Sequence, residues 1–288
     1  MTMKQIVLMM AFWTFISGAA VSSATASDPL PGGQGSSSID ATSDKNAYAI
    51  VIGVEQYRQK LPKSDFATHD AQAVTEALTK VMGYPAENVI TLINDQATNA
   101  DLAKYVEKWL LKNAKTGSTV FIYFSGLGTS NPETGDVFLV PYDGDPSFID
   151  QTGYSLKRMS DALKKLPARE IIVVLDSCFS GAGGKSVLVD GARPLAINLQ
   201  KSFVLSRNMT VLAAASGDQK CSSYQAKGQS LFTYYLLRGI HEEDVMRPDG
   251  SLDITDLFGY TRPQVERIAR KKNNSAQTPQ LIESTKNQ

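Results

Sequence analysis

The sequence predicts an α/β protein in which a mainly parallel sheet is covered by helices on both faces. Continuous apolar runs alternate with segments of helical periodicity from Lys45 onward, which is the pattern of such sheets. Several runs end in Gly-rich or Cys-bearing turns, and open α/β sheets place their sites beyond the carboxyl ends of the strands. The 288 residues, 42% of them hydrophobic, are sufficient for one sizeable core or two small ones.

The N-terminal region is predicted to lie outside this domain. Residues 1–26 have a basic start, a short apolar stretch and the small residues Ala24 and Ala26, which is typical of a cleaved signal peptide. An uncleaved anchor is the alternative, but about a dozen apolar residues are short for a span of about 20. We therefore expect export to the periplasm or secretion, with no membrane span after cleavage. Residues 27–44 are predicted to be a flexible spacer, and 45–288 a single domain.

The first half of the domain alternates strand and helix. Residues 48–54 form a continuous apolar run, which is typical of a strand buried on both faces. Apolar residues at helical spacing, closed by Gly83, predict a helix over 70–82. A strand at 89–93 and a helix at 99–113 with one apolar face follow.

The second half continues the alternation but contains one long connection. Residues 181–208 have no clear period and are long for a connection inside a compact domain. The other segments predict strands at 118–124, 136–140, 171–175 and 209–215, and helices at 155–165, 230–240 and 252–271.

Composition excludes several classes of function. Lys and Arg number 29, and Asp and Glu also number 29, so net charge does not favour binding to nucleic acid or to an anionic membrane. We expect no cofactor and no metal, because the sequence contains neither a zinc-type His/Cys cluster nor a Gly-rich phosphate motif. The acidic segment around Gly250 resembles a calcium loop only weakly, because Val245 and Arg247 occupy ligand positions. This segment is better explained as the start of a helix.

Cys178 lies just past a predicted core strand, between Asp176 and the small residues Ser177, Ser180 and Gly181. A thiol in this position would be exposed at the sheet edge, and the tight turn would direct backbone N–H groups into the same space. A buried cysteine that acts as a small hydrophobic residue is the alternative. Spacing alone leaves both interpretations open.

A series of short blocks occurs in a characteristic order along the chain. The blocks are Ala49-Ile50-Val51-Ile52-Gly53-Val54, Asp70-Ala71, Tyr123-Phe124-Ser125-Gly126-Leu127-Gly128, Leu139-Val140-Pro141-Tyr142-Asp143, Leu175-Asp176-Ser177-Cys178-Phe179-Ser180-Gly181, Ala213-Ala214-Ala215-Ser216-Gly217-Asp218-Gln219, Gly228 to Leu237 and Gln277-Thr278-Pro279-Gln280. In sequence and order these blocks resemble those of the caspase/metacaspase family. The resemblance implies a caspase-like three-layer sandwich with a large-subunit-like part at 45–180, a linker at 181–208 and a small-subunit-like part at 209–281.

The family resemblance implies a Cys-His dyad with Cys178 as the nucleophile, but Leu127 occupies the histidine position. Leucine has no ionisable group, so it can neither deprotonate the thiol nor protonate a leaving amine. The resemblance also implies that Gly128 and Cys178 supply the oxyanion-stabilising N–H groups. The chain has two histidines, His69 and His241, and both are expected to be surface or capping residues rather than substitute bases.

By the same resemblance, Asp70 and Asp176 match the acidic positions that accept an Arg or Lys side chain in metacaspases. Two converging carboxylates can hold a guanidinium bidentately. The alternatives are a helix N-cap for Asp70 and a strand-end hydrogen-bond acceptor for Asp176. Asp218 is a weaker third candidate. The expected partner is therefore a peptide or protein with a basic side chain, or an active homologue of this chain.

Two functions remain open at this point. The first is a pseudoenzyme that captures basic peptides and stays uncut in its own linker, and the second is an active cysteine endopeptidase that cleaves after Arg or Lys with an unidentified proton carrier. The sequence also leaves open whether Cys178 and Cys221 form a disulfide or remain two free thiols.

Overall fold

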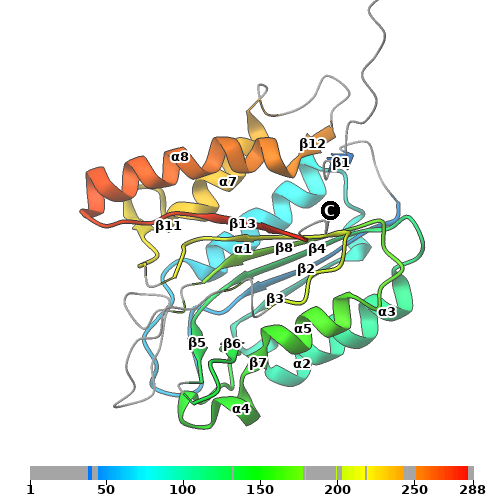
Figure 1. The fold of residues 1–288 in the computed structure, drawn as a ribbon, viewed down its shortest axis with the longest axis horizontal. Helices are drawn as coiled ribbons and strands as arrows, with labels where there is room; N and C mark the ends of the chain where they lie inside the picture. Colours follow the sequence, from blue (N-terminus) through cyan, green and yellow to red (C-terminus); the bar gives the residue numbers. More distant parts are fainter. Residues whose placement is uncertain are drawn as a thin grey trace, which may run out of the picture. The chain divides into compact units, whose positions relative to one another are not determined.

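A six-stranded sheet lies at the centre of the molecule, between two layers of helices (Figure 1). The computed structural model describes residues 38–40, 45–131, 133–177, 179, 199, 203–217, 219–242, 245 and 251–284. The strand order is β13-β9-β8-β4-β2-β3, in which β13 is antiparallel to its neighbour and the other pairs are parallel. The strands are β2 (Ala47–Gly53), β3 (Val89–Ile93), β4 (Thr119–Ser125), β8 (Glu170–Asp176), β9 (Met209–Ala213) and β13 (Gln280–Glu283).

Both faces of this sheet are buried, which explains why its central strands are continuous apolar runs. On β2, Ala49 and Val51 belong to one core cluster, whereas Ile50 and Ile52 belong to the cluster on the opposite face. Successive side chains of a strand point to opposite faces, so a strand covered on both sides needs apolar residues at every position. The predicted α/β class, with a mainly parallel sheet and helices on both faces, is confirmed.

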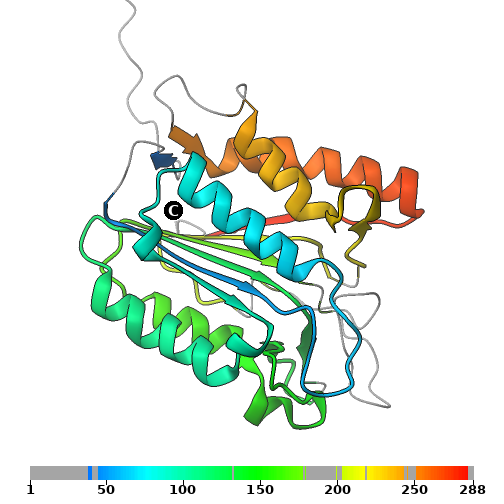
Figure 2. The ribbon, with the colours of Figure 1, turned by 180° about the vertical axis from the view of Figure 1, so that it is seen from behind.

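The helices divide into two layers, which are seen from opposite sides in Figures 1 and 2. The layer packed on the Ala49 and Val51 face contains α1 (Ala67–Glu76), its π-helical continuation η1 (Ala77–Val81), α7 (Leu231–His241) and α8 (Ile254–Asn273). The opposite layer contains α2 (Asn99–Ala103), π-helical η4 (Lys104–Trp109), α3 (Leu110–Asn113) and α5 (Leu156–Leu163). The segments predicted as helices at 70–82, 99–113, 155–165, 230–240 and 252–271 therefore all contain helices.

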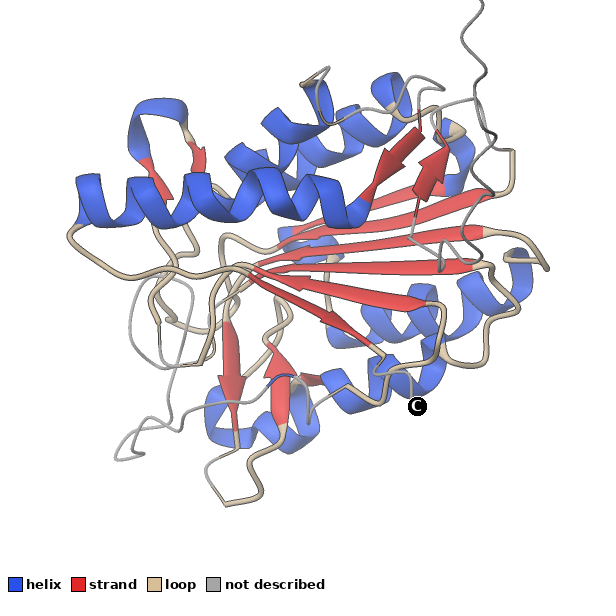
Figure 3. Ribbon diagram, turned by 45° about the horizontal axis from the view of Figure 1, so that its top comes forward, coloured by secondary structure: helices blue, strands red, loops and turns tan. Residues whose placement is uncertain are grey.

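Smaller elements surround the central sheet (Figure 3). A three-stranded antiparallel sheet, referred to below as the small sheet, follows β4. It contains β5 (Gly128–Ser130), β6 (Val137–Leu139) and β7 (Tyr154–Ser155). The remaining elements are β1 (Ser38–Asp40), η2 (Ala86–Asn88), η3 (Asn94–Gln96), η5 (Pro146–Phe148), α4 (Ile149–Thr152), β10 (Ser223–Tyr224), η6 (Gln225–Lys227), β11 (Gln229–Ser230) and β12 (Ser251–Asp253).

The ends of the domain contain structure that the sequence pattern does not predict. Part of the segment expected to be a spacer, Ser38–Asp40, forms β1 and pairs antiparallel with β12. The rest of 1–44, including the predicted signal peptide, lies outside the described residues.

The acidic segment that ends at Asp256 starts helix α8, as the sequence predicts. Asp253 Oδ1 accepts a 2.7 Å hydrogen bond from the N–H of Thr255. Among the helices that the structure describes, none has the length and apolar character of a membrane span.

Candidate functional site

The carboxyl ends of the three central strands lie in one row. Gly53 pairs with Ser125, and Ser125 pairs with Asp176, across β2, β4 and β8. The turns that follow these strands therefore leave the sheet from the same edge, as the parallel arrangement predicts. One turn contains Leu127, and another contains Ser177, the described residue before Cys178.

Helix α1 approaches this edge because Gly53 has no side chain. A Cβ at Gly53 would lie 2.5 Å from the carbonyl oxygen of Ala67 and 2.7 Å from the Cβ of Ala71. Such close contact between strand and helix requires glycine at this position. Asp70 lies in the first turn of α1, whereas the N-cap position belongs to Phe66. The interpretation of Asp70 as an N-cap is therefore wrong, and its carboxylate is directed elsewhere.

Asp70 and Asp176, referred to below as the aspartate pair, converge on the side chain of Ser230. Both aspartates are completely buried. Ser230 Oγ lies 2.6 Å from Asp70 Oδ2 and also hydrogen-bonds Asp176 Oδ2, while the N–H of Ser230 donates to both carboxylate oxygens of Asp70. Thr233 Oγ1 donates to Asp176 Oδ2 at 2.6 Å. The interpretation of Asp176 as a strand-end acceptor is correct, and the acceptor lies beside Asp70 as the resemblance implies.

A buried tyrosine extends this hydrogen-bond chain. The Tyr123 hydroxyl lies 2.6 Å from Thr233 Oγ1. Because the Thr233 proton is donated to Asp176, Tyr123 must be the donor in its contact with Thr233. Burial, followed by the charges of Asp70 and Asp176, raises the pKa of Tyr123 well above its ordinary value of 10.0. Tyr123 therefore remains protonated at neutral pH and completes the chain as a hydroxyl donor.

Sequence reasoning did not identify Ser230, Thr233 or Tyr123 as members of this site. A serine directly before a helical pattern indicates an N-cap, and Ser230 does occupy the N-cap position of α7. Its side chain makes no capping hydrogen bond and contacts the aspartate pair instead. In the sequence, Ser230 and Thr233 belong to the Gly228 to Leu237 block, which resembles the family. The block does not indicate which of its side chains point toward the aspartate pair.

The Leu127 side chain is part of a hydrophobic cluster. It is completely buried, and the cluster also contains Phe138, Val140 and Ile149. The backbone N–H of Leu127 donates a 2.6 Å hydrogen bond to the hydroxyl of Tyr57. The position where the resemblance implies a histidine is therefore packed as part of a hydrophobic cluster.

Tyr57 is the ionisable side chain that contacts the Leu127 backbone, and it does not act as a base. Its hydroxyl donates to the carbonyl oxygen of Val54 at 3.0 Å and accepts from the N–H of Leu127. Burial of the hydroxyl raises the pKa of Tyr57 well above its ordinary value. At neutral pH this side chain holds its proton and uses it in a structural hydrogen bond.

Gly128 packs against both neighbours of Cys178. A Cβ at Gly128 would lie 2.4 Å from Phe179 Cδ1 and 2.6 Å from Ser177 Oγ. Cys178 itself lies outside the described residues, and so does Asp218. The structure therefore brings Gly128 to the turn that contains Cys178, through residues 177 and 179.

The register of the small sheet determines the direction of the Gly128 N–H. Val140 donates to the carbonyl oxygen of Leu127 at 2.9 Å, and Gly128 pairs with Leu139 in the next position. Hydrogen-bonded and non-hydrogen-bonded pairs alternate in an antiparallel ladder, so Gly128 and Leu139 form a non-hydrogen-bonded pair. The Gly128 N–H consequently points away from β6.

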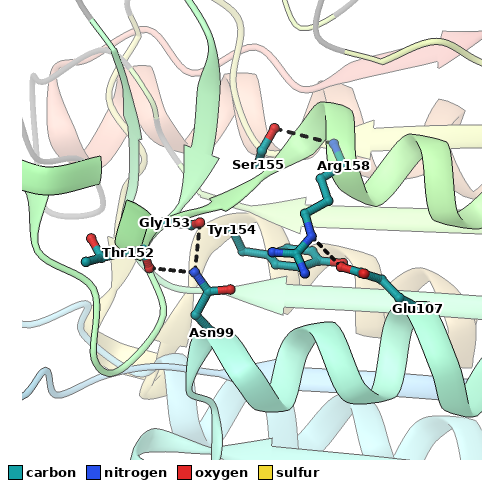
Figure 4. Close-up of polar contacts among 7 residues, drawn as sticks. All are labelled: Asn99, Glu107, Thr152, Gly153, Tyr154, Ser155 and Arg158. Carbon is teal, nitrogen blue, oxygen red and sulfur yellow. Dashed lines mark hydrogen bonds and ion pairs between the residues drawn. The ribbon is translucent and has the colours of Figure 1, made fainter. Parts of the chain in front are cut away.

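The small sheet is anchored to the layer that contains α2 and η4 (Figure 4). Asn99 Nδ2 donates to the carbonyl oxygen of Gly153 at 3.0 Å. Glu107 Oε1 accepts a hydrogen bond from the Tyr154 hydroxyl at 3.1 Å and forms a 2.6 Å ion pair with Arg158 Nε. These contacts hold β7, and through its pairing with β6 they hold the strand that contains Gly128.

The two histidines are exposed, as expected from the sequence. His69 Nδ1 lies 2.7 Å from the carbonyl oxygen of Gly228. His241 ends α7, and both histidines line a groove of about 440 Å³ between the α1–η1 helix and α7. The lining of this groove contains no residue of the turn around Leu127.

Cys221, which lies beyond β9, is disulfide-bonded, and the sequence contains one other cysteine, Cys178. Among the described residues, no three His, Cys, Asp or Glu side chains are grouped closely enough to hold a metal ion.

The three-layer fold and the strand-end site define an α/β protein of the caspase-like class. The fold is similar to that of a Geobacter sulfurreducens protein of known crystal structure, with a TM-score of 0.56 and 13% identity over 84% of this chain and 95% of that chain. It is also similar to caspase-1 from Spodoptera frugiperda, with a TM-score of 0.52 and 14% identity over 85% of this chain and 89% of that chain. The predicted caspase-like sandwich is confirmed.

The chain belongs to the caspase-domain family, because the family profile described as caspase domain matches residues 46–288. It is 26% identical to metacaspase-1A of Aspergillus oryzae in an alignment of 149 positions that covers 46% of this chain and 34% of that protein. It is 28% identical to metacaspase-7 of Arabidopsis thaliana in an alignment of 158 positions that covers 50% of this chain and 36% of that protein. The matches thus span about a third of each metacaspase. The family resemblance inferred from the sequence is confirmed.

Proposed function

We propose that this protein is an exported cysteine-peptidase homologue that binds peptides or proteins through an Arg or Lys side chain and has lost the ability to cleave them. Leu127 carries the proposal. An apolar side chain, fully buried among apolar neighbours, occupies the position where the resemblance requires the general base. Loss of a general base typically costs about 10²–10⁴-fold in rate, and amide hydrolysis also needs a proton for the leaving amine.

The aspartate pair supports binding of a basic side chain. Asp70 and Asp176 come from two different elements and direct carboxylate oxygens toward one point, the hydroxyl of Ser230. A planar guanidinium matches two such oxygens, and hydrogen bonds between charged groups are the strong ones. Its binding partner is a basic segment of a substrate-like protein or of an active homologue.

An active endopeptidase that cleaves after Arg or Lys is the second candidate. The outward N–H of Gly128 and the retained Cys178 favour it, because both belong to the chemistry rather than to binding. A thiol near its ordinary pKa is a few per cent thiolate at neutral pH.

Because Cys221 is disulfide-bonded, we further propose that its partner is Cys178, which would mask the nucleophile until it is reduced.

The deciding measurement is release of a fluorophore from Arg- and Lys-linked amides by reduced protein. We expect the wild type to match Cys178→Ala, whereas Leu127→His gains at least about 10²-fold, since a general base is worth about that much. If the wild type turns over and Cys178→Ala does not, the protein is an active peptidase and the pseudoenzyme proposal is wrong. The N terminus of protein recovered from the exported fraction tests the export proposal, with cleavage expected after Ala26.

A further inference from the structure

Ser230 occupies a helix N-cap position without using its side chain as a cap. Ser230 precedes Leu231, the first residue of α7, and has extended backbone angles of φ −70° and ψ 148°, typical of an N-cap. Its hydroxyl is directed away from the helix and contacts Asp70 Oδ2 and Asp176 Oδ2. The residue is 1% exposed. The hydroxyl therefore lies between the two carboxylates.

A basic side chain would need this same place. The two oxygens that contact Ser230 Oγ converge from α1 and β8, and they are the ones that a guanidinium or ammonium group would bind in the proposed pocket. One atom and an incoming cation cannot occupy the same point. The hydroxyl must therefore leave before a basic side chain can bridge Asp70 and Asp176.

The hydroxyl has a second hydrogen-bonding position nearby. The first N–H groups of a helix have no partner within the helix, and a serine at the N-cap usually accepts from the second or third of them. In α7 these groups belong to Phe232 and Thr233. Rotation of Ser230 about its Cα–Cβ bond would exchange the contact with the carboxylates for a capping contact, so the departure replaces one hydrogen bond with another.

The backbone of Ser230 is held in place by contacts of its own. Ser230 pairs with Ser223 in the β10–β11 ladder, and the next residue, Leu231, donates to the carbonyl oxygen of Ser222 at 2.9 Å. The Ser230 N–H also donates to Asp70. These contacts do not involve the hydroxyl, so the motion is confined to one side-chain rotation.

We infer that Ser230 is the gate of the basic-side-chain pocket: its hydroxyl closes the aspartate pair in the empty protein and rotates onto the start of α7 when a cation enters. The inference rests on the proposed function, because it assumes that the aspartate pair binds a basic side chain. A closed state lowers the apparent affinity in proportion to the fraction of open protein. Removing the hydroxyl should therefore tighten binding.

The test compares the binding of benzamidine, a small aromatic amidine, with that of uncharged benzamide by calorimetry on the purified full chain. We expect Ser230→Ala and Ser230→Gly to bind benzamidine about tenfold more tightly than the wild type, since opening breaks a hydrogen bond to a charged group. Glycine is included because it is itself a tolerated N-cap. Asp176→Asn should abolish the preference for benzamidine.

Ser160→Ala is the matched control for loss of a buried serine hydroxyl. Ser160 is completely buried in α5, and its Oγ donates to the carbonyl oxygen of Val204 at 2.8 Å. Its substitution should leave the affinity for benzamidine unchanged. If both Ser230 variants bind as weakly as the wild type or more weakly, while Asp176→Asn removes binding, the gate is wrong and the basic pocket stands. If no variant prefers benzamidine to benzamide, the proposed pocket itself is wrong.

Discussion

The turn around Leu127 and the aspartate pair follow neighbouring strands of one sheet, yet they are opposite in chemistry. Leu127 follows β4, and its side chain belongs to a hydrophobic cluster with Phe138, Val140 and Ile149. Asp176 ends β8 and, together with Asp70, contacts hydroxyl and N–H donors in a region that is equally buried. Both regions are closed to solvent, so the contrast lies in their chemistry and not in their exposure.

Under the proposed function, binding and proton transfer would depend on separate parts of the strand-end edge. Burying carboxylates is costly unless they are hydrogen-bonded, and this protein supplies the donors in Ser230 and Thr233. Packing a leucine in an apolar cluster needs no such support. In the proposed pseudoenzyme, catalysis would be lost at one turn while the aspartate pair is kept.

The largest expected effect is on stability, from Leu127→Ala. A completely buried leucine replaced by alanine typically lowers the free energy of unfolding by about 3 kcal/mol or more. Chemical denaturation measures this loss, and Leu111→Ala, at a side chain that is 49% exposed, should change stability by less than about 0.5 kcal/mol. If folded Leu127→Ala also lost its affinity for benzamidine, the two regions would not be independent.

A smaller loss is expected for Gly128→Ala, at the point where the Leu127 turn meets the turn containing Cys178. The added Cβ would lie 2.4 Å from Phe179 Cδ1, and overpacking of this kind costs about 1–3 kcal/mol. Gly259→Ala in α8 is the matched control, because nothing lies within 4 Å of its Cβ position and alanine favours a helix. Thermal unfolding should shift down for the first and slightly up for the second. Equal shifts would contradict the close contact.

The sequence was most informative where burial is symmetrical. Strands β2, β4 and β8 were recognisable because both faces of the sheet are covered, which leaves uninterrupted apolar runs. Strands β5 and β13 were not predicted. Each is only 3 or 4 residues long and begins in a segment whose Gly, Pro and Gln residues indicate a turn.

The aspartate pair was predictable only through the family resemblance, and its donors were not predictable at all. Asp70 and Asp176 are separated by more than a hundred residues, and Ser230 lies a further 54 residues from Asp176. Local capping rules predict that Ser230 caps the N terminus of α7. Only the tertiary structure shows that its hydroxyl hydrogen-bonds the carboxylates instead. The state of Cys221 was equally hidden, because two cysteines in a sequence do not reveal whether they are close.

The smallest expected effect is the loss of stability caused by replacing Tyr123. Tyr123 is the buried tyrosine beside the aspartate pair, and Tyr57 is the corresponding tyrosine beside the Leu127 turn. The pKa of Tyr123 is raised well above 10.0 in the folded protein, by burial and by Asp70 and Asp176. Below pH 10 the folded and unfolded chains both keep the proton, so the stability is fully present. Above it the unfolded chain loses the proton first, and stability falls with increasing pH by up to about 1.4 kcal/mol per pH unit.

Tyr123→Phe should remove the contribution of Tyr123 to the fall in stability above pH 10. It should also lower the free energy of unfolding at neutral pH by about 1 kcal/mol, because the hydrogen bond to Thr233 is lost. Urea unfolding on both sides of pH 10 measures the two effects separately, since the loss at neutral pH and the gain in alkaline solution have opposite signs. Tyr57→Phe should lessen the alkaline loss as well, because burial raises the pKa of Tyr57. Only Tyr123→Phe should also alter the affinity for benzamidine, because its hydroxyl is linked to Asp176 through Thr233. If Tyr57→Phe changed this affinity equally, the effect of Tyr123→Phe could not be assigned to the hydrogen-bond chain through Thr233. The Leu127 turn and the aspartate pair would then not be independent regions.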